Sequence, residues 1–241
     1  MKEHASANMR FAIISDIHSN LQALEEALRL VDQLRVEKIH CLGDVVGYGG
    51  NPNECVALVR KRCDIVVKGN HDLATVDLSH SHFHPEAGKI ANAWTFKVLT
   101  AENRRYLAWL PFRHVGFDCT FVHASPESPF DWEHVSAPDA VLRQFPHFST
   151  SACFVGHTHI PGIIGEDMQA FALKRGMKFL INVGSVGQPR DGNPQLSLGV
   201  IDTEIWKYEN IRADYDIQGA ADAIIKAGLP DVLAERLEHG V

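Results

Sequence analysis

Acidic, imidazole and amide side chains follow directly after the short apolar segments that we expect to be strands. Six blocks have this arrangement, and in chain order they are Asp16-Ile17-His18, Gly43-Asp44, Gly69-Asn70-His71-Asp72, His123, Gly156-His157-Thr158-His159 and Asn182. In open α/β sheets the carboxyl ends of the strands form the edge at which ligands bind. We therefore expect these side chains to meet in one site.

The types of these side chains indicate a metal centre. Carboxylate, imidazole and amide groups without a thiolate suit Mn, Fe, Zn, Ni or Co. The blocks offer more plausible ligands than one tetrahedral zinc needs, and about the number that two ions with a shared ligand need. Asp16 with His18, and His157 with His159, are separated by one residue. In extended backbone the two members of each pair point to the same side.

The segments between the first blocks alternate between strand and helix patterns. The apolar run 11–14 predicts a strand that is buried on both faces. Further strands are expected at 39–42 and 65–67, and helices at 20–35 and from Asn51-Pro52, which is a typical helix start. Alternating strands and helices predict a parallel sheet with right-handed crossovers.

The remainder of the chain is predicted to be a helical insertion followed by a half that is rich in strands. Residues 73–110 form the insertion, with a polar loop and helices at 86–99 and 101–109. Strands are expected at 112–116, 118–122, 152–155, 169–173, 178–181, 197–202 and 205–212, and helices at 217–227 and 230–238. Because the sequence contains no repeat and no linker, residues 1–241 are predicted to form a single α/β domain, with residues 1–9 as a disordered leader.

Composition and charge exclude several classes of protein. With 45% hydrophobic and 22% charged residues the chain is neither disordered nor fibrous. No apolar stretch approaches the ~20 residues of a membrane span, and the polar leader lacks the apolar core of a secretory signal. Because 23 Lys and Arg face 30 Asp and Glu, the formal net charge is 23 − 30 = −7, which argues against nonspecific binding of nucleic acid. Five cysteines without a Cys-x-x-Cys pair predict free thiols in the cytoplasm.

The ordered blocks resemble those of the calcineurin-like metallophosphoesterase family. The resemblance runs from Asp16 to His159 and continues to Arg190. It implies a four-layer α-β-β-α sandwich, in which two mixed sheets are flanked by helices. It also implies a centre of two divalent transition-metal ions, with Mn favoured. The implied ligands are Asp16, His18 and His159 for the first ion, Asn70, His123 and His157 for the second, and Asp44 as the bridge. His71 is implied to lie beside the leaving group or a phosphoryl oxygen.

One block departs from the pattern of the protein serine/threonine phosphatases in that family. They typically carry Gly-Asp-x-x-Asp-Arg-Gly, whereas Gly47 and Tyr48 stand here in place of the Asp-Arg pair. The chain is therefore more similar to the small prokaryotic phosphodiesterase-like branch. The replaced Asp orients the catalytic histidine in that pattern, and Asp72 is our candidate to orient His71 instead.

Three residues after the last block are candidates to contact the substrate. Arg190 could reach a substrate phosphate, and the alternative is an ordinary surface ion pair. Gly184 and Ser185 could lend backbone amides to the site. The alternating histidines at 80, 82 and 84 are expected in a solvated loop, and the alternative is an accessory contact with a metal or the substrate.

The expected function is that of a cytoplasmic, dinuclear metal-dependent phosphoesterase. A metal-bridging hydroxide would attack phosphorus in a small phosphorylated substrate, a phosphodiester or a phosphomonoester, and His71 would protonate the leaving oxygen. Substrate specificity is expected to lie in residues 73–110 and in the loop after His123.

Three alternatives differ in class from this expectation. A serine/threonine-type protein phosphatase and a nuclease are disfavoured by the missing Asp-Arg pair and by the acidic balance. A non-catalytic binding scaffold on the same fold is disfavoured because every expected ligand is present. The apolar stripe at 217–227 fits either core packing or the contact face of a homo-oligomer.

Overall fold

The computed structural model describes residues 9–169 and 172–241, whose strands form two five-stranded sheets. The strands are β1 (Arg10–Ile14), β2 (Lys38–Cys41), β3 (Ile65–Val66), β4 (Arg113–Gly116), β5 (Cys119–Val122), β6 (Ala152–Val155), β7 (Gly162–Gly165), β8 (Phe179–Asn182), β9 (Leu196–Asp202) and β10 (Lys207–Ala213). The order is β10-β9-β1-β2-β3 in the first sheet and β4-β5-β6-β8-β7 in the second. Both sheets are mixed, since each contains two parallel and two antiparallel strand pairings.

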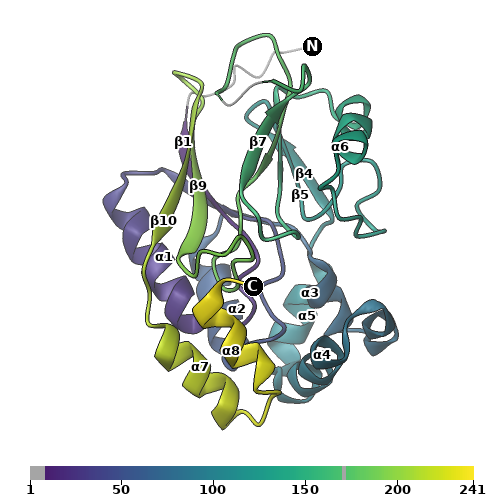
Figure 1. The fold of residues 1–241 in the computed structure, drawn as a ribbon, viewed down its shortest axis with the longest axis vertical. Coiled ribbons are helices and arrows are strands. Elements are labelled where there is room, and N and C mark those ends of the chain that lie inside the picture. The colour runs from purple at the N-terminus through teal and green to yellow at the C-terminus, as the bar shows by residue number, and fades with distance from the viewer. Residues whose placement is uncertain (1–8, 170–171) are drawn as a thin grey trace.

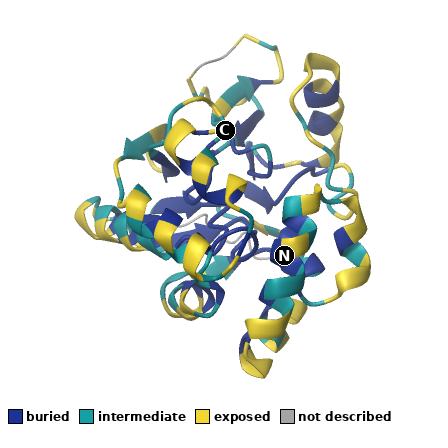
Figure 2. Cartoon of the chain, turned by 60° about the horizontal axis from the view of Figure 1, so that its bottom comes forward, coloured by how far each residue is buried: buried dark blue, intermediate teal, exposed yellow. Residues whose placement is uncertain are grey.

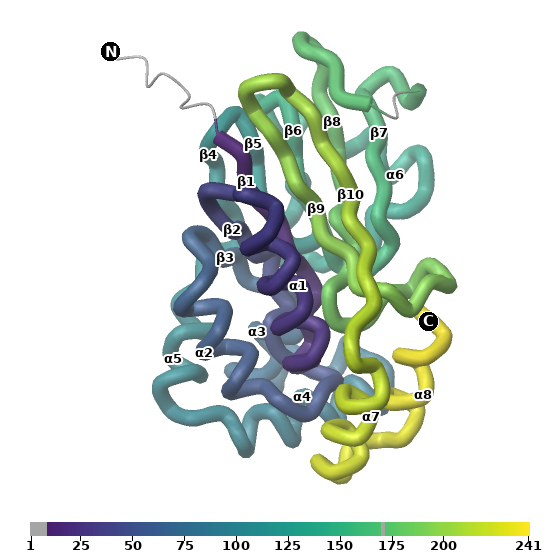
Figure 3. The backbone as a smooth tube through the Cα atoms, turned by 90° about the vertical axis from the view of Figure 1, so that its left-hand side faces the viewer, coloured from purple at the N-terminus to yellow at the C-terminus, as the bar shows by residue number. Residues whose placement is uncertain are grey.

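Helices cover the outer faces and one end of the two sheets. They are α1 (Leu21–Gln33), α2 (Pro52–Arg62), α3 (Asn70–Ala74), α4 (Glu86–Val98), α5 (Ala101–Trp109), α6 (Pro138–Gln144), α7 (Ile217–Lys226) and α8 (Val232–His239), with 3₁₀ helices η1 (Leu78–Phe83) and η2 (Phe145–His147). In Figure 1, α1 lies outside the first sheet and α6 outside the second, while α4, α5, α7 and α8 gather below. Figure 3 shows α1 lying across the face formed by β1 and β2. The predicted four-layer sandwich is confirmed.

Alternating side chains of β1 fill two separate cores. Ala12 and Ile14 pack with the apolar stripes of α1 and α2, and Phe11 and Ile13 pack between the sheets against Phe121 and other large residues of the second sheet. These four side chains of β1 are fully buried, and the strands form the dark interior of Figure 2. The prediction of a strand buried on both faces is therefore confirmed.

One predicted strand is wrong, and three short helices lie where the sequence predicts a loop. Of residues 169–173, positions 170–171 lie outside the described residues, and the others have no strand structure. The antiparallel partner of β8 is β7, in which Ile163 pairs with Ile181. A four-residue strand bounded by glycines has no alternating pattern that would identify it. Helices α3, η1 and α6 are similarly too short to carry a clear apolar period.

Two further expectations concern the cysteines and the membrane. All five cysteines are unpaired, as predicted. In residues 9–169 and 172–241 no helix combines the length and the apolar character that crossing a bilayer requires. Residues 1–8 of the expected leader lie outside the described part of the chain.

A polar side chain is buried in the apolar core between the sheets. His40 of β2 is fully buried, and its ring stacks on Phe11 with 4.6 Å between centroids. Phe121 packs edge-on against the same ring at 4.8 Å. Neither ring nitrogen has a hydrogen-bond partner among the described residues. Burial lowers the pKa of His40 to about 4, so its imidazole is neutral at pH 7.

We predict that His40 makes the fold sensitive to acid. As the pH falls below 6.5, the ordinary pKa of histidine, the unfolded chain takes up a proton at His40 before the folded chain does. The contribution of neutral His40 to the free energy of unfolding is therefore complete above pH 6.5 and is lost as the pH falls towards 4. The total loss is about 3 kcal/mol, because each tenfold difference in proton affinity between the two states is worth ~1.4 kcal/mol. Urea unfolding of His40→Leu across this range should show a correspondingly smaller loss than the wild type. His82→Leu, at an exposed position of η1, is the control, and equal slopes for all three proteins would contradict the prediction.

Candidate metal centre

The seven expected metal ligands come together where the strands of both sheets end. Asp16 and His18 follow β1, Asp44 follows β2, Asn70 begins α3, His123 follows β5, and His157 and His159 follow β6. Six of them are buried, and Asn70 is partly exposed. Residues up to 143 positions apart in the chain thus share one site, because the two sheets end at the same place.

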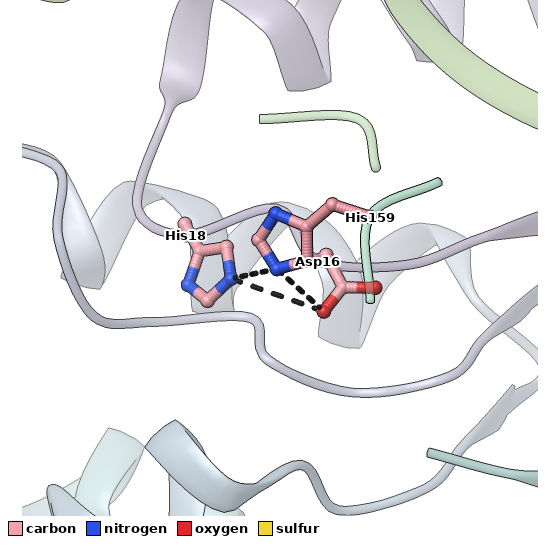
Figure 4. Close-up of side chains that lie close together, drawn as sticks. All are labelled: Asp16, His18 and His159. Atoms are coloured by element: carbon pink, nitrogen blue, oxygen red, sulfur yellow. Dashed lines mark hydrogen bonds and ion pairs between the residues drawn. The ribbon is translucent and has the colours of Figure 1, made fainter. Parts of the chain in front are cut away.

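The first group of potential ligands consists of Asp16, His18 and His159. Figure 4 shows the two rings and the carboxylate converging. Nε2 of His159 lies 3.3 Å from Oδ1 of Asp16 and 3.1 Å from Nε2 of His18. These distances match the ~3.0–3.4 Å that separate neighbouring ligands around an ion bound at about 2.1 Å.

The second group is centred on His123. Its Nε2 lies 3.0 Å from Oδ1 of Asn70, 3.2 Å from Nδ1 of His157 and 3.4 Å from Oδ2 of Asp44. Asp44, His123 and His157 can converge on one ion. Asn70 adds a neutral oxygen from the exposed side, so this group has one ligand that water can reach.

Asp44 lies between the two groups. Its Oδ2 is 3.6 Å from Nε2 of His18 in the first group and 3.4 Å from Nε2 of His123 in the second. Its other oxygen, Oδ1, accepts a hydrogen bond of 2.8 Å from the backbone amide of His71. A single oxygen of Asp44 therefore faces both groups, in the position of a bridging ligand.

Each of the four imidazoles in these groups has one nitrogen beside a backbone carbonyl. Nδ1 of His18 lies 3.2 Å from the oxygen of Val46, Nδ1 of His123 2.9 Å from that of Leu42, Nε2 of His157 2.9 Å from that of Trp132, and Nδ1 of His159 beside that of Gln188. A carbonyl only accepts, so each of these nitrogens carries the hydrogen. The other nitrogen of a neutral ring then turns its lone pair into the site, as metal-binding histidines do.

Burial and the two carboxylates together set the pKa values of the groups in the site. Burial tends to raise the pKa of Asp16 and of Asp44, but nearby imidazoles outweigh it and hold both pKa values well below the usual range. Burial keeps the pKa of His18 and of His157 well below normal. For His123 burial also lowers the pKa, yet Asp44 and Asp16 overcome it and raise the value to about 9. The two carboxylates thus attract positive charge strongly.

The donor set fits divalent cations. Oδ1 of Asp16 is buried and has no hydrogen-bond partner in the described structure. A buried carboxylate oxygen without a partner is costly, and here it faces imidazole lone pairs that are also acceptors. Cations at the two groups would satisfy all of these atoms at once. The residues present are therefore suited to hold two ions.

The backbone is strained at the ligands themselves. Asp16, His18, Asp44, His157 and His159 all have positive φ, between 50° and 65°. Non-glycine residues seldom adopt this region, which costs on the order of 1–3 kcal/mol per residue. The turns allow side chains that leave different strands to point at one place.

Two glycines of the sequence blocks allow close approach to the carboxylates. A Cβ on Gly69 would lie 2.1 Å from Oδ1 of Asp44, and a Cβ on Gly156 would lie 2.4 Å from Oδ2 of Asp16. Any larger residue at either position would displace a ligand.

His71 lies beside both groups, but it is oriented by a residue that the sequence analysis missed. Its Nδ1 is 2.9 Å from Oδ1 of Asn92 on α4. The ring passes directly over Gly47, where a Cβ would lie 2.6 Å from Nδ1. Asn92 is a fully buried polar residue on the inner face of the predicted helix 86–99. That unusual position is the signal that could have identified it.

The expected role of Asp72 as the orienting partner is corrected. Its Oδ1 accepts from the backbone amides of Val45 and Val46, and its Oδ2 accepts from that of Gly69. Asp72 therefore fixes the loop that carries Asp44. It does so because consecutive helical side chains diverge by about 100°, so it points away from the ring of His71.

The expected role of Gly184 and Ser185 is also corrected. The amide of Gly184 donates to Oδ1 of Asn182, and the fully buried Ser185 hydroxyl donates to the backbone oxygen of Asp16. Asn182 itself donates to the oxygen of Gly156 and to Thr158. These residues support the ligand loops from behind and do not line the cavity.

A cavity of about 550 Å³ opens beside the metal ligands. Its walls come from residues 80–85 and 130–134, within the two regions that were expected to carry specificity, and from Tyr48 and Arg190. His80 and His84 line it, and the ring of His84 lies 4.2 Å from that of His71. Among the three histidines, His82 is exposed to solvent and does not line the cavity, and it lies in η1 and not in the predicted loop.

Comparisons with known proteins agree with this geometry. The profile of the calcineurin-like phosphoesterase superfamily domain matches residues 9–205. The chain is 42% identical over 239 residues to the uncharacterized protein MJ0912 of Methanocaldococcus jannaschii, covering 95% of this chain and 97% of that protein. It is 29% identical over 209 residues to the phosphodiesterase YfcE of Escherichia coli, covering 82% and 89%.

Solved structures show the same similarity. A metallophosphoesterase from Sphaerobacter thermophilus superposes with a TM-score of 0.87 at 41% identity, covering 97% of this chain and 100% of that one. The protein PH1004 from Pyrococcus horikoshii shares the fold, with a TM-score of 0.83 at 22% identity over 96% and 98% of the two chains.

We predict that Asp44→Asn lowers metal content at both groups, whereas Asn70→Ala mainly empties the second. Asp44 supplies a negative charge that both ions would share, and Asn70 supplies a neutral oxygen to one of them. Metal per chain by plasma mass spectrometry, with anomalous scattering to locate each ion, separates the two results. Asp139→Asn, exposed on α6, is the control. One fully occupied site in Asp44→Asn, together with loss of both in Asn70→Ala, would assign the bridge elsewhere.

Proposed function

The chain belongs to the calcineurin-like phosphoesterase superfamily and is a hydrolase of phosphoester bonds, and we propose that it uses two divalent metal ions to cleave small phosphodiesters. The observation that carries this proposal is the position of Asp44, whose Oδ2 faces both groups of ligands at 3.4–3.6 Å. A site for a single ion has no use for a carboxylate that is shared in this way.

The ligands divide as the resemblance implies. Asp16, His18 and His159 would hold the first ion, Asn70, His123 and His157 the second, and Asp44 both. Bound ions of this kind supply Lewis-acid polarisation of the phosphoryl group and a nucleophile at neutral pH. Manganese is the metal that we propose, and it is one of the five transition metals that imidazole, carboxylate and amide donors without thiolate suit.

Two further residues act on the substrate in this proposal. His71 donates its Nδ1 hydrogen to Asn92, and burial lowers its pKa to about 3, so its ring is neutral at pH 7 and its Nε2 carries a lone pair. In this state Nε2 can accept a proton or a hydrogen bond beside the phosphoryl group, and it can pass a proton to the leaving oxygen only after it has taken one up. Arg190 lines the same cavity, and in the described structure no carboxylate lies within ion-pair distance of it. Its Nη2 donates to the neutral oxygen of Gln188. Its guanidinium is therefore available for a phosphoryl oxygen.

Two features favour a small phosphodiester over a phosphoprotein or a nucleic acid. Tyr48, which replaces the Arg of protein phosphatases, is buried and packs against His71 with 4.3 Å between centroids. Arg190 is the single Lys or Arg among the described residues that line the cavity, and the net charge of −7 is unsuited to a polyanion. The relative YfcE is itself described as a phosphodiesterase. Five unpaired thiols support a cytoplasmic location.

We predict that His71→Ala keeps nearly two metal ions per chain but loses roughly 10²–10⁴ in kcat, the usual span for general acid–base catalysis. The reason is that its ring is placed for proton transfer and its Nδ1 is bound to Asn92. Metal content and steady-state rates on the same preparation test both halves. His147→Ala, an exposed histidine outside the cavity, should change neither. If His71→Ala retained half of the metal, His71 would have to be counted among the ligands.

We also predict the class of bond that is cleaved. Manganese-loaded protein should hydrolyse bis(4-nitrophenyl) phosphate, because the cavity presents one guanidinium and no second cation from the position of Tyr48. The measurement compares this diester with 4-nitrophenyl phosphate and with a phosphoserine protein at equal concentrations. Rapid release of phosphate from the phosphoprotein, without turnover of the diester, would instead indicate a protein phosphatase.

A further inference from the structure

Two large apolar rings are exposed at the cavity that contains the metal ligands. Phe83 is 78% exposed and Phe130 is 62% exposed, and both line this cavity. They come from different parts of the chain, Phe83 from the end of η1 and Phe130 from the loop between β5 and α6. Exposed apolar side chains in a concave site indicate that a ligand covers them.

The ring of Phe130 rests on a fixed support. The ring of Phe112 packs against it with 4.4 Å between centroids. Nζ of Lys68 in turn lies over the ring of Phe112, 4.8 Å from its centroid. Trp132 packs near Phe112 and near His123, at 5.9 Å from each. The exposed ring of Phe130 is therefore the outermost member of a packed aromatic group.

Both aromatic residues are tied to the metal centre. The backbone oxygen of Trp132, two residues after Phe130, accepts the hydrogen bond from Nε2 of His157. On the other loop, His84 follows Phe83 and packs its ring on His71. Contacts with His157 and with His71 therefore hold both aromatic loops beside the candidate metal centre.

We propose that Phe83, Phe130 and Trp132, the aromatic wall, bind the base of a nucleotide, so that the substrates are small nucleoside phosphodiesters. This inference rests on the proposed function and names its substrate class. Bases stack on aromatic side chains whatever their sequence. A cavity of about 550 Å³ is larger than a phosphoryl group needs and falls in the range of small-molecule sites.

Polar groups beside the aromatic wall distinguish a base from other apolar groups. Asp131, His80 and His134 line the same cavity and can form hydrogen bonds with the edge of a base. An acyl chain would remove water from these groups and offer no hydrogen bond in its place, which is unfavourable. A nucleic-acid strand would require more than the single guanidinium of Arg190. A phosphotyrosine side chain shares the aromatic character of a base but offers no polar edge of comparable extent.

The test measures binding to the manganese-loaded protein by calorimetry, with adenosine 5′-monophosphate and methyl phosphate as probes. Both carry a phosphate monoester, and they differ by the nucleoside. Stacking on one ring contributes about 5- to 150-fold in affinity. The wild type should therefore bind the nucleotide at least about 5-fold more tightly than methyl phosphate. Phe83→Leu and Phe130→Leu should each reduce the ratio of the dissociation constant of methyl phosphate to that of the nucleotide. Phe83→Tyr and Phe130→Tyr should preserve this ratio.

Trp109→Leu is the matched control, because Trp109 is an aromatic residue that is 86% exposed and does not line the cavity. It should leave the ratio unchanged. Equal affinity for the two probes in the wild type, or a ratio that neither Leu variant changes, would overturn the inference. Tighter binding of a phosphotyrosine peptide than of the nucleotide would overturn it as well. Hydrolysis of bis(4-nitrophenyl) phosphate is measured in parallel, since its absence would count against the proposed function whatever the binding ratio.

Discussion

The site depends on a set of hydrogen-bond acceptors that face one another in a buried space. Asp16 and Asp44 contribute carboxylates there, and each of four imidazoles turns toward them the nitrogen that does not donate to a backbone carbonyl. In a low dielectric such an arrangement is unfavourable unless positive charge lies among the acceptors. The orientation of the rings therefore suits the site to cations, and the left-handed backbone at the expected ligands lets their side chains point at one place.

The same carbonyls connect the metal centre to the rest of the fold. They belong to Leu42 and Val46 after β2, to Gln188 near Arg190, and to Trp132 in the loop before α6. Each imidazole is thus hydrogen-bonded to a segment that also packs in the core or lies close to the cavity. A change in one of these loops would alter the direction of a ligand, so the chemistry and the substrate pocket are mechanically coupled.

Much of the fold could be predicted from the sequence, and so could the gathering of the seven expected ligands in one place, because both depend on residues that are close together in the chain. A buried strand is visible as the apolar run 11–14, and a ligand follows its strand within a few residues. Asn92 can be singled out as a polar residue on the inner face of a predicted helix, but its contact with His71 could not be predicted, because it depends on where α4 lies in the folded chain. Asp72 was an error of the same origin: proximity in sequence to His71 does not determine where a helical side chain points. The aromatic wall likewise exists only once two distant loops meet.

The replacement of the Asp-Arg pair by Gly47 and Tyr48 has a consistent physical account. Gly47 leaves room for the ring of His71, since a Cβ at this position would lie 2.6 Å from Nδ1. Residue 47 therefore cannot supply the acceptor for the Nδ1 hydrogen of His71, and Asn92 supplies it from α4. Tyr48 removes a cation from this side of the cavity, and the guanidinium of Arg190 lies 5.8 Å from the centre of the Tyr48 ring. Asn92, the residue that contacts His71, is neutral, whereas an Asp would carry a charge. Arg190 belongs to the segment after β8 and lines the cavity. The proposed preference for a phosphodiester rests on one guanidinium beside the expected metal ligands and on the aromatic rings beyond it, because a phosphodiester carries a single negative charge and an ester on either side.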